Sequence, residues 1–237
     1  MNNPFDFFEK IYCINLDSRT DRWNECCHIF NKYKIYNKVE RFSAIKFSNK
    51  NPIFNKITSQ IGCAMSHFEI VKKAKKENLK NYLVFEDDFS FEYEPEFFFD
   101  LLHKCTFDLP NDWSMFYLGV NLFDLYGVPP IEKWSPNLYK LNCCHTTHAF
   151  SVNNKTYDLI LRGCPNMENE SLIKWHNENE AIDVYFSKQI LSKNKCFTSN
   201  PLLSLQRPSF SDIEQKNYDY RSSIIHNFNN FKNALDK

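Results

Sequence analysis

The chain has 237 residues, which suffices for one large domain, and it carries 29 basic and 29 acidic residues, so its formal net charge is zero. Without net charge there is no long-range attraction to nucleic acid or to an anionic membrane surface, and neither is expected as a partner. Hydrophobic residues make up 43% of the chain and aromatic residues 16%, a composition that supports a sizeable core and excludes a disordered protein.

The nine cysteines are odd in number and irregularly spaced, and no charged segment followed by an apolar signal region opens the chain. This pattern predicts reduced thiols and a cytoplasmic protein. The adjacent pairs at 26–27 and 143–144, the second followed by two histidines, lack the spacing of about two to four residues that zinc ligands usually show, so buried thiols are favoured over a metal site. No apolar run reaches about 18 residues, so no membrane span is expected.

In chain order, the first elements expected are a strand, a helix and a second strand. Residues 11–16 are a short apolar run rich in β-formers, and the turn formers and helix caps of residues 17–21 follow it. Residues 39–45 predict the second strand. Thr58 and Ser59 are candidate caps of a further helix. Its apolar residues recur at helical spacing, at positions 61, 64, 65, 68, 71 and 74.

Two buried strands come next. Residues 82–85 are continuously apolar, as in a strand covered on both faces, and residues 115–119 repeat that pattern. Weaker strand and helix signals follow at residues 138–141, 149–152, 156–162, 181–191 and 218–235. Strands that alternate with helices predict an α/β fold with a mainly parallel, mixed sheet flanked by helices.

No linker interrupts this pattern. The asparagine- and lysine-rich residues 48–56 are predicted to be a loop inside the domain. We therefore expect residues 1–237 to form a single domain, with a core over about residues 10–213 and a tail over residues 214–237.

Three adjacent acids, Glu86, Asp87 and Asp88, directly follow the strand predicted at residues 82–85. In open α/β sheets ligands bind beyond the carboxyl ends of the strands, which is where these acids fall. Their mutual repulsion favours a cation, and hard carboxylate oxygens suit Mg²⁺ or Mn²⁺, which would hold a substrate diphosphate. A solvated turn or a helix cap explains the triplet equally well, so neighbouring segments must decide.

The chain lacks other catalytic signatures. Its four glycines, at positions 62, 119, 127 and 163, form neither a dinucleotide-binding fingerprint nor a phosphate-binding loop. It has no G-x-S-x-G elbow, and Ser66 and His67, as neighbours on a helix, point to different sides. A hydrolase triad is therefore unsupported, and phosphate has to be held by other means.

Six motifs in order carry a signal more specific than the acids alone. They are Ile14-Asn15-Leu16 with Arg19 and Asp21-Arg22, Phe42-Ser43-Ala44-Ile45, Gly62-Cys63-Ala64-Met65-Ser66-His67, Val84-Phe85-Glu86-Asp87-Asp88, Thr147-His148-Ala149-Phe150, and the stretch from Pro201 to Ile213. Together they resemble glycosyltransferase family 25, which includes bacterial lipooligosaccharide galactosyltransferases and the collagen galactosyltransferases.

The resemblance implies a GT-A-type nucleotide-sugar-binding fold, a UDP-sugar donor carrying galactose or glucose, Mn²⁺ (or Mg²⁺), and inverting transfer to a hydroxyl. The acceptor would be a glycan, a lipid-linked sugar or a hydroxylated protein side chain. The acidic triplet matches the family's metal motif, so Asp88 is expected to bind the metal directly. Glu86 or Asp87 would then meet the donor ribose or make a second, water-mediated metal contact.

Other residues receive roles from the same resemblance. Asn15, Leu16 and Arg19 match the family's opening motif and are expected against the nucleotide. Asp183, an acid among apolar residues at a predicted helix start, matches a late acidic position and is the candidate catalytic base, with helix capping as its alternative. His67 is a candidate contact for the donor diphosphate or else a core residue.

Three residues in the last two motifs each have two possible roles. His148 could contact metal or phosphate, but its place at a strand start favours a structural role. Gln206 and Arg207 lie in a loop that could close over the donor or meet the acceptor, or make ordinary loop hydrogen bonds.

Two other functions stay open at this point. One is a degenerate member of the same fold that serves as a binding or assembly module. The other is a metal-dependent phosphohydrolase that uses the same acids. Slow donor hydrolysis that leaves UDP and free sugar indicates the transferase, whereas release of phosphate or of a sugar phosphate indicates the phosphohydrolase.

Overall fold

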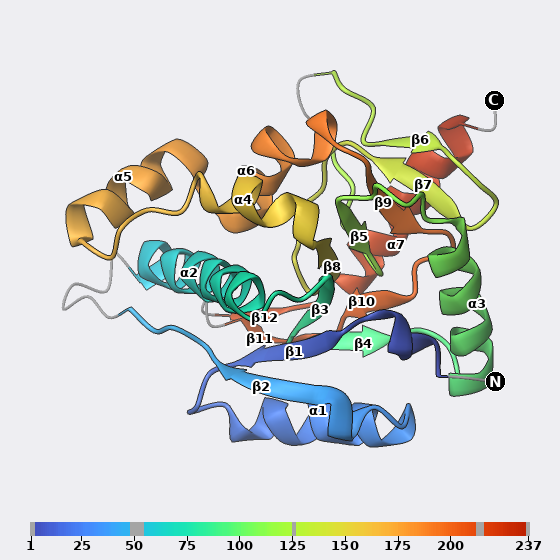
Figure 1. Ribbon diagram of the computed structural model, residues 1–237, viewed down its shortest axis with the longest axis horizontal. Coiled ribbons are helices and arrows are strands. Elements are labelled where there is room, and N and C mark those ends of the chain that lie inside the picture. Colours follow the sequence, from blue (N-terminus) through green and yellow to red (C-terminus); the bar gives the residue numbers. More distant parts are fainter. Residues whose placement is uncertain (1–2, 48–54, 125–126, 212–215, 236–237) are drawn as a thin grey trace.

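The computed structural model describes residues 3–47, 55–124, 127–211 and 216–235, and its centre is an eight-stranded mixed sheet (Figure 1). In spatial order its strands are β2 (Val39–Ser43), β1 (Lys10–Asn15), β3 (Asn81–Glu86), β8 (Ala149–Asn153), β5 (Met115–Tyr117), β9 (Cys196–Ser199), β7 (Leu138–Leu141) and β6 (Ile131–Lys133). β8 and β7 run against the other strands, so the sheet is mainly parallel in strand direction, as expected.

Helices cover both faces of this sheet (Figure 1). The α-helices are α1 (Thr20–Lys32), α2 (Asn55–Lys76), α3 (Pro95–Asp108), α4 (Tyr157–Leu161), α5 (Asn169–Asn179), α6 (Ile182–Gln189) and α7 (Arg221–Leu235). Short 3-10 helices are η1 (Pro4–Phe7), η2 (Tyr36–Lys38), η4 (Asn154–Thr156) and η5 (Leu191–Lys193). Two small ribbons pair β4 (Phe89–Phe91) with β10 (Ser204–Gln206) and β11 (Ser209–Ser211) with β12 (Lys216–Tyr218).

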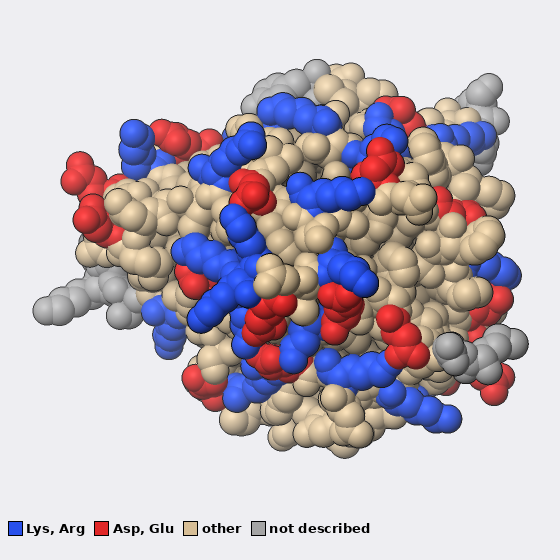
Figure 2. Space-filling model, viewed as in Figure 1, with Lys and Arg blue, Asp and Glu red and all other residues tan. Residues whose placement is uncertain are grey.

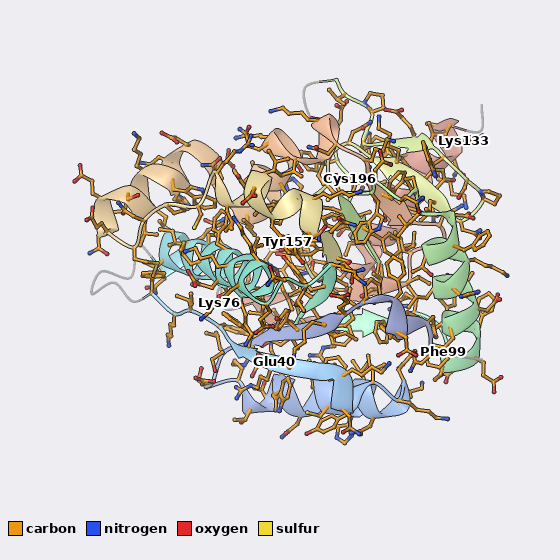
Figure 3. The ribbon with its side chains drawn as sticks, in the orientation of Figure 1. Glu40, Lys76, Phe99, Lys133, Tyr157 and Cys196 are labelled. Carbon is orange, nitrogen blue, oxygen red and sulfur yellow. The ribbon has the colours of Figure 1, made fainter. Side chains whose placement is uncertain are left out.

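The sheet separates two hydrophobic clusters, which explains why the central strands are apolar throughout. In β3, Tyr82 and Val84 face the cluster that contains α2, α4, α5 and α6. Leu83 and Phe85 face the other cluster, which contains α1 and α3. Because successive side chains of a strand point to opposite faces, both sets are buried. Figure 3 shows side chains packed along both faces, with the buried Tyr157 and the half-buried Phe99 labelled on opposite sides of the sheet.

The lysines near the end of α2 are paired on the surface. Lys73 lies 2.7 Å from Glu40, Lys72 lies 2.7 Å from Glu69, and Lys75 pairs with Asp158. Figure 2 shows basic and acidic side chains interleaved over this face. Exposed pairs of this kind contribute about 0–1 kcal/mol each, so the basic segment is a solvated helix face.

The structure departs from the sequence prediction at the start of α2. This helix already includes Asn55, so Thr58 and Ser59 lie within it, and the expectation that they cap it is wrong. The Thr58 hydroxyl instead donates to the carbonyl of Asn55, a bond that a threonine inside a helix can make. Of the loop predicted at 48–56, residues 48–54 lie outside the described residues and residues 55 and 56 are helical.

Several elements were not among those expected from the sequence. In the middle of the chain these are β4, α3 and β6, and nearer its end they are α5, β9, β10, β11 and β12. Part of the 201–213 motif, Asp212 and Ile213, lies outside the described residues. The predicted tail helix exists as α7, and its residues Ile224 and Phe228 are buried in the core. Within the described part of the chain, no helix combines the length and apolarity needed to cross a bilayer. All nine cysteines are described and all are free thiols.

Candidate active site

The acidic triplet forms a tight connection between β3 and β4, and the aromatic core fixes its two ends. Phe85, before the acids, and Phe89, after them, are fully buried, and their rings stack with centroids 4.3 Å apart. The ring of Phe30 in α1 stacks on Phe89 at 5.4 Å between centroids and lies 6.0 Å from Phe85. Because both flanking rings are locked in the core, the acids are held at the carboxyl end of β3, with Glu86 as its last residue.

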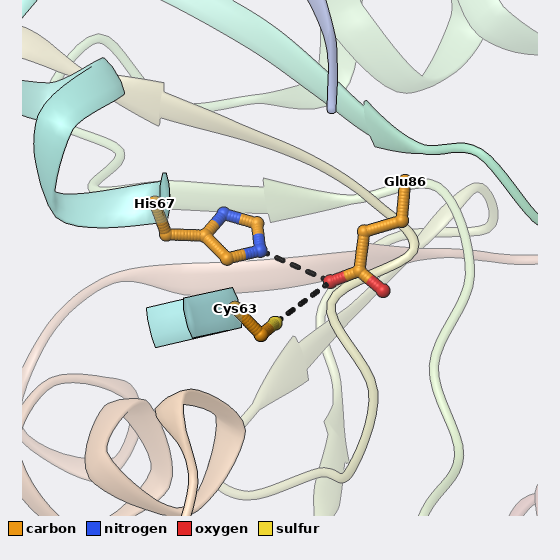
Figure 4. Close-up of side chains that lie close together, drawn as sticks. All are labelled: Cys63, His67 and Glu86. Atoms are coloured by element: carbon orange, nitrogen blue, oxygen red, sulfur yellow. Dashed lines mark hydrogen bonds and ion pairs between the residues drawn. The ribbon is translucent and has the colours of Figure 1, made fainter. Parts of the chain in front are cut away.

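Glu86 is anchored by side chains from two other segments. Its Oε1 accepts a hydrogen bond from the Thr147 hydroxyl at 2.6 Å and lies 3.0 Å from Nε2 of His67 (Figure 4). The Cys63 thiol lies 3.8 Å from the same oxygen. Burial raises the pKa of Glu86, but the hydrogen bonds from His67 and Thr147 outweigh it, and the net shift is downward. Glu86 is therefore an ionised carboxylate at neutral pH.

The motif of residues 62–67 explains how α2 presents these partners. A Cβ on Gly62 would lie 2.4 Å from the carbonyl oxygen of Ile45, so only glycine lets the helix approach the segment that follows β2. Ser66 ties the two together, because its hydroxyl accepts from the Ile45 N–H at 2.8 Å and donates to the Gly62 carbonyl at 2.7 Å. Cys63 and His67, four residues apart on one helix face, then point at Glu86.

The side chain of Asp87 points toward β1 and α1. Its Oδ1 lies 2.5 Å from Nη1 of Arg22, and its Oδ2 accepts from the Asn15 side chain at 2.7 Å. Arg22 also donates to the Ser209 hydroxyl and to the Phe210 carbonyl. Asp87 therefore links β1 to α1, and Arg22 extends the link to β11.

The opening motif takes part in the same network of hydrogen bonds, through Asn15. The Asn15 side-chain oxygen accepts from Nε and Nη2 of Arg41 at 2.9 and 2.6 Å. Asn15 is 1% exposed, and both ends of its amide are hydrogen-bonded. Leu16 and Arg19 lie in the β1–α1 loop, where Arg19 pairs with Asp21 at 2.9 Å. None of these residues lines the pocket around Glu86 and Asp88.

Asp88 is the least satisfied of the three acids. Its Oδ1 is buried without a hydrogen-bond partner in the described structure, and so is Oε1 of Gln206. The Gln206 amide nitrogen lies 3.5 Å from Oδ2 of Asp88. Burial and the neighbouring charge of Glu86 raise the pKa of Asp88 to about 7. Each of these buried oxygens therefore lacks a donor, a deficit that a hard cation would relieve.

A pocket of about 350 Å³ brings these acids together with Asp183. Glu86, Asp88 and Gln206 line it from the strand end and the β10 ribbon, and Asp183 lines it from the start of α6. Its remaining lining residues are Gln60, Cys63, Asn121, His145, Thr146, Thr147, Ala181, Ile182 and Tyr220. Three of the acids predicted from sequence therefore share one pocket, whereas His67, 1% exposed, lies behind Glu86.

Asp183 is fixed by the loop that precedes β8. Its Oδ2 accepts from the Thr146 N–H at 2.9 Å, and Nδ1 of His145 lies 3.5 Å from the same oxygen. Burial raises the pKa of Asp183, but the hydrogen bonds from His145 and Thr146 outweigh this effect. The net shift of the pKa is downward, so the carboxylate is ionised. The N-cap of α6 is Ala181, so Asp183 lies in the first turn; its Oδ1 accepts the Val184 N–H at 2.8 Å.

His148 and Gly119 form a support below the pocket. His148 is fully buried, and its Nε2 lies 3.3 Å from the Ser204 carbonyl oxygen. Burial lowers the pKa of His148 to about 4, so the ring is neutral. A Cβ on Gly119 would lie 1.8 Å from that same carbonyl oxygen, so this close packing needs glycine. The structural reading of His148 agrees with this geometry.

Several functional side chains were not predicted individually. Three of them, Thr147, Arg22 and Cys63, lie inside the family motifs, but the motifs alone did not indicate which side chains they contact. His145, which stacks on Phe123 with centroids 3.7 Å apart, carried no signal beyond its place after two cysteines.

Comparison with known proteins gives the following matches. The model of the family described as "Glycosyltransferase family 25 (LPS biosynthesis protein)" matches residues 8–118. A protein of Xenopus laevis, "Procollagen galactosyltransferase 1-A", is 26% identical over 206 residues, which cover 78% of this chain and 32% of that protein. "Procollagen galactosyltransferase 2" of Mus musculus is 28% identical over 154 residues, 56% of this chain and 24% of that one. The chain thus spans about a third or less of the length of these relatives.

Solved structures overlap this chain in part. "Crystal structure of a glycosyltransferase involved in the glycosylation of the major capsid of PBCV-1" is 10% identical with a TM-score of 0.42, covering 87% of this chain and 95% of that one. A mannose-1-phosphate geranyltransferase from Thermus thermophilus is 10% identical with a TM-score of 0.46, covering 80% and 72%. The family resemblance indicated by the motifs is confirmed by the sequence matches. Asp183 and Gln206 lie beyond the segment that the family model matches.

Proposed function

We propose that this chain, which resembles glycosyltransferase family 25 in its motifs and its relatives, is a metal-dependent inverting glycosyltransferase of the GT-A type. It moves galactose or glucose from a UDP-sugar to a hydroxyl of a glycan or glycoconjugate acceptor. The observation that carries the proposal is the pocket in which Glu86, Asp88 and Asp183 meet. The names of the relatives, which describe galactosyltransferases, support the sugar class.

Asp88 and Gln206 are the proposed ligands of the cation, Mn²⁺ or Mg²⁺. Their buried Oδ1 and Oε1 lack hydrogen bonds within the described structure, and both residues line the pocket. Carboxylate and amide oxygens fit a hard divalent ion. When bound, the ion would supply positive charge against the diphosphate of the donor and its departing UDP. Glu86 lies on the same wall and is available for a second, water-mediated contact or for the donor ribose.

The opening motif has a positioning role in this proposal. Asn15 and Asp87 are committed to Arg41 and Arg22, so they hold the acid loop in place and do not touch the donor. His67 acts through Glu86 in the same way. Leu16 and Arg19, in the loop after β1, remain the proposed contacts for the nucleotide.

Asp183 is the proposed catalytic base. In an inverting transfer, the acceptor hydroxyl attacks the anomeric carbon of the sugar from the face opposite UDP, and its proton passes to a carboxylate. Asp183 lines the same pocket as Glu86 and Asp88, is ionised, and is oriented by the Thr146 N–H and by His145.

The proposal includes a single domain over residues 1–237. It is supported by the packing of α7, because Ile224 and Phe228 are buried in the same cluster as α2 and α6. Tyr220, just before α7, also lines the pocket.

Isothermal titration of UDP with and without Mn²⁺ tests this function. We expect UDP to bind in the presence of Mn²⁺ and to lose most of its affinity without it. Absent or metal-independent binding would overturn the assignment. Product analysis separates the other candidates: UDP plus free sugar indicates the transferase, phosphate or a sugar phosphate indicates a phosphohydrolase, and binding without turnover indicates a binding module.

A further inference from the structure

We propose that Cys63, His67 and Glu86 form a second metal site, which takes zinc or a similar transition metal and is distinct from the oxygen ligands of Asp88 and Gln206. Each residue offers one ligand atom, and the three atoms lie within 4.8 Å of one another. Figure 4 shows the thiol of Cys63 and the imidazole nitrogen of His67 both directed at one carboxylate oxygen of Glu86. In the part of the chain that the structure describes, this is the single cluster of three such ligands.

The distances from the carboxylate oxygen to the other two ligand atoms are close to those of a tetrahedral zinc site. Usual zinc bond lengths place a nitrogen and an oxygen ligand about 3.4 Å apart, and a sulfur and an oxygen ligand about 3.6 Å apart. Here Nε2 of His67 lies 3.0 Å from Oε1 of Glu86, and Sγ of Cys63 lies 3.8 Å from the same oxygen. These two distances differ from the zinc values by a few tenths of an ångström, and the third, between the thiol sulfur and the imidazole nitrogen, is at most 4.8 Å. Side-chain rotation of Cys63 would have to close the remaining gap.

The supports of the three ligands are rigid. Cys63 and His67 are one turn apart on α2, which Gly62 and Ser66 hold against the Ile45 segment. Glu86 ends β3, and the Thr147 hydroxyl donates to its Oε1. A hydrogen-bonded ligand held on regular elements is the arrangement that metal sites use to orient their ligands.

The fourth coordination position would open into the pocket. Cys63 and Glu86 both line it, whereas His67 lies behind them. Three protein ligands and one position open to water distinguish an accessible zinc site from a closed structural one. Binding replaces the thiol proton of Cys63, which passes to solvent, and the two anionic ligands then balance the charge of the ion.

The two sites differ in ligand chemistry and share a wall. Thiolate and imidazole ligands select zinc-like ions, and carboxylate and amide oxygens select magnesium and manganese. Zinc at Cys63 would occupy the carboxylate of Glu86. Zinc is therefore expected to antagonise any donor that uses this carboxylate, a consequence that rests on the proposed function while the site itself does not.

The test titrates Co²⁺, a spectroscopic substitute for zinc, into the intact protein freed of metal. We expect one equivalent to bind with the near-ultraviolet absorption of a cobalt–thiolate bond, and Zn²⁺ to displace it. Cys63→Ser should abolish that band and weaken Co²⁺ binding at least ~10-fold. Cys164→Ser, at a half-buried cysteine outside the pocket, is the matched control and should retain the band.

Two results would overturn the site: no stoichiometric Co²⁺ binding by the folded wild type, or a band of unchanged intensity in Cys63→Ser. Asp88→Asn separates this inference from the proposed function. The cobalt–thiolate band should persist in that variant, whatever its effect on binding of Mn²⁺ and UDP. Loss of the band in folded Asp88→Asn would show that the two sites are one, against the proposal.

Discussion

Arg22 and Asp87 form a buried ion pair, with Nη1 2.5 Å from Oδ1 and each side chain 10% exposed. The middle acid of the triplet is thereby turned away from the pocket that Glu86 and Asp88 line. Three adjacent carboxylates thus divide into two that face the pocket and one that holds the framework.

Replacement of Asp87 by Asn should act mainly on stability. It leaves the Arg22 guanidinium buried without its counter-charge, and breaking a buried pair costs about 3–5 kcal/mol. Urea unfolding measures the loss. Asp21→Asn, at an exposed acid paired with Arg19, is the control and should change the free energy of unfolding by less than about 1 kcal/mol. An Asp87→Asn protein of wild-type stability that fails to bind UDP would show direct donor contact instead.

Binding of Mn²⁺ should depend on both Asp88 and Gln206. Asp88→Asn should abolish it, because the only charged ligand of the proposed pair is lost. Gln206→Leu should weaken it about 10-fold or more, because an apolar side chain cannot supply the oxygen. Electron paramagnetic resonance of free Mn²⁺ reports both affinities without nucleotide. Glu94→Gln, at an exposed acid that pairs with Lys32, should bind as wild type. Equal affinity in Gln206→Leu would remove Gln206 from the ligand set.

Asp183→Asn should separate chemistry from binding. Without the carboxylate, donor hydrolysis in the presence of Mn²⁺ should slow by ~10²–10⁴-fold, the usual contribution of a general base. The affinity for UDP should stay within a few-fold of wild type, because Asp183 touches neither Asp88 nor Gln206 by any hydrogen bond in the described structure. Asp158→Asn, at an exposed acid of α4, is the comparison. A parallel loss of UDP affinity would assign Asp183 to the donor instead.

Gly62→Ala weighs helix propensity against a steric clash. Alanine is favoured over glycine in a helix interior by about 1 kcal/mol. Its Cβ would however lie 2.4 Å from a backbone oxygen, that of Ile45, which cannot rotate away. We expect the clash to win, with a net destabilisation of about 1–3 kcal/mol in chemical unfolding. An increase in stability would mean that α2 can shift outward at no cost.

The protein should lose stability in acid through His148. Burial lowers the pKa of this ring from 6.5 to about 4 in the folded state. Between these two values the unfolded chain binds the proton and the folded chain does not, so stability falls as the pH drops through that window. A shift of this size corresponds to about 3 kcal/mol. Unfolding of His148→Asn over the same window should lack this component, and an identical pH profile in both proteins would exclude His148 as its source.

Local patterns in the sequence determined the framework. The apolar runs at 11–16 and 82–85 predicted β1 and β3, because strands covered on both faces must be apolar throughout. The same argument placed residues 86–88 at a carboxyl end, and the ordered motifs indicated the family. Features that depend on tertiary packing were not predicted correctly. The four-residue strand β9 was missed, and Thr58 and Ser59, predicted to cap α2, lie inside that helix.

Only the tertiary structure decided which acid does what. Successive residues leaving a strand point to opposite sides, but the sequence does not say which side is the pocket. The side that each acid faces depends on two distant residues. Arg22, 65 residues before Asp87, forms an ion pair with it, and Gln206, 118 residues after Asp88, lies beside that acid. Spacing along a chain carries no information about contacts closed over such distances. The sequence by itself therefore located the acids, and the packing of α1, α2, α6 and β10 around them assigned each one its partner.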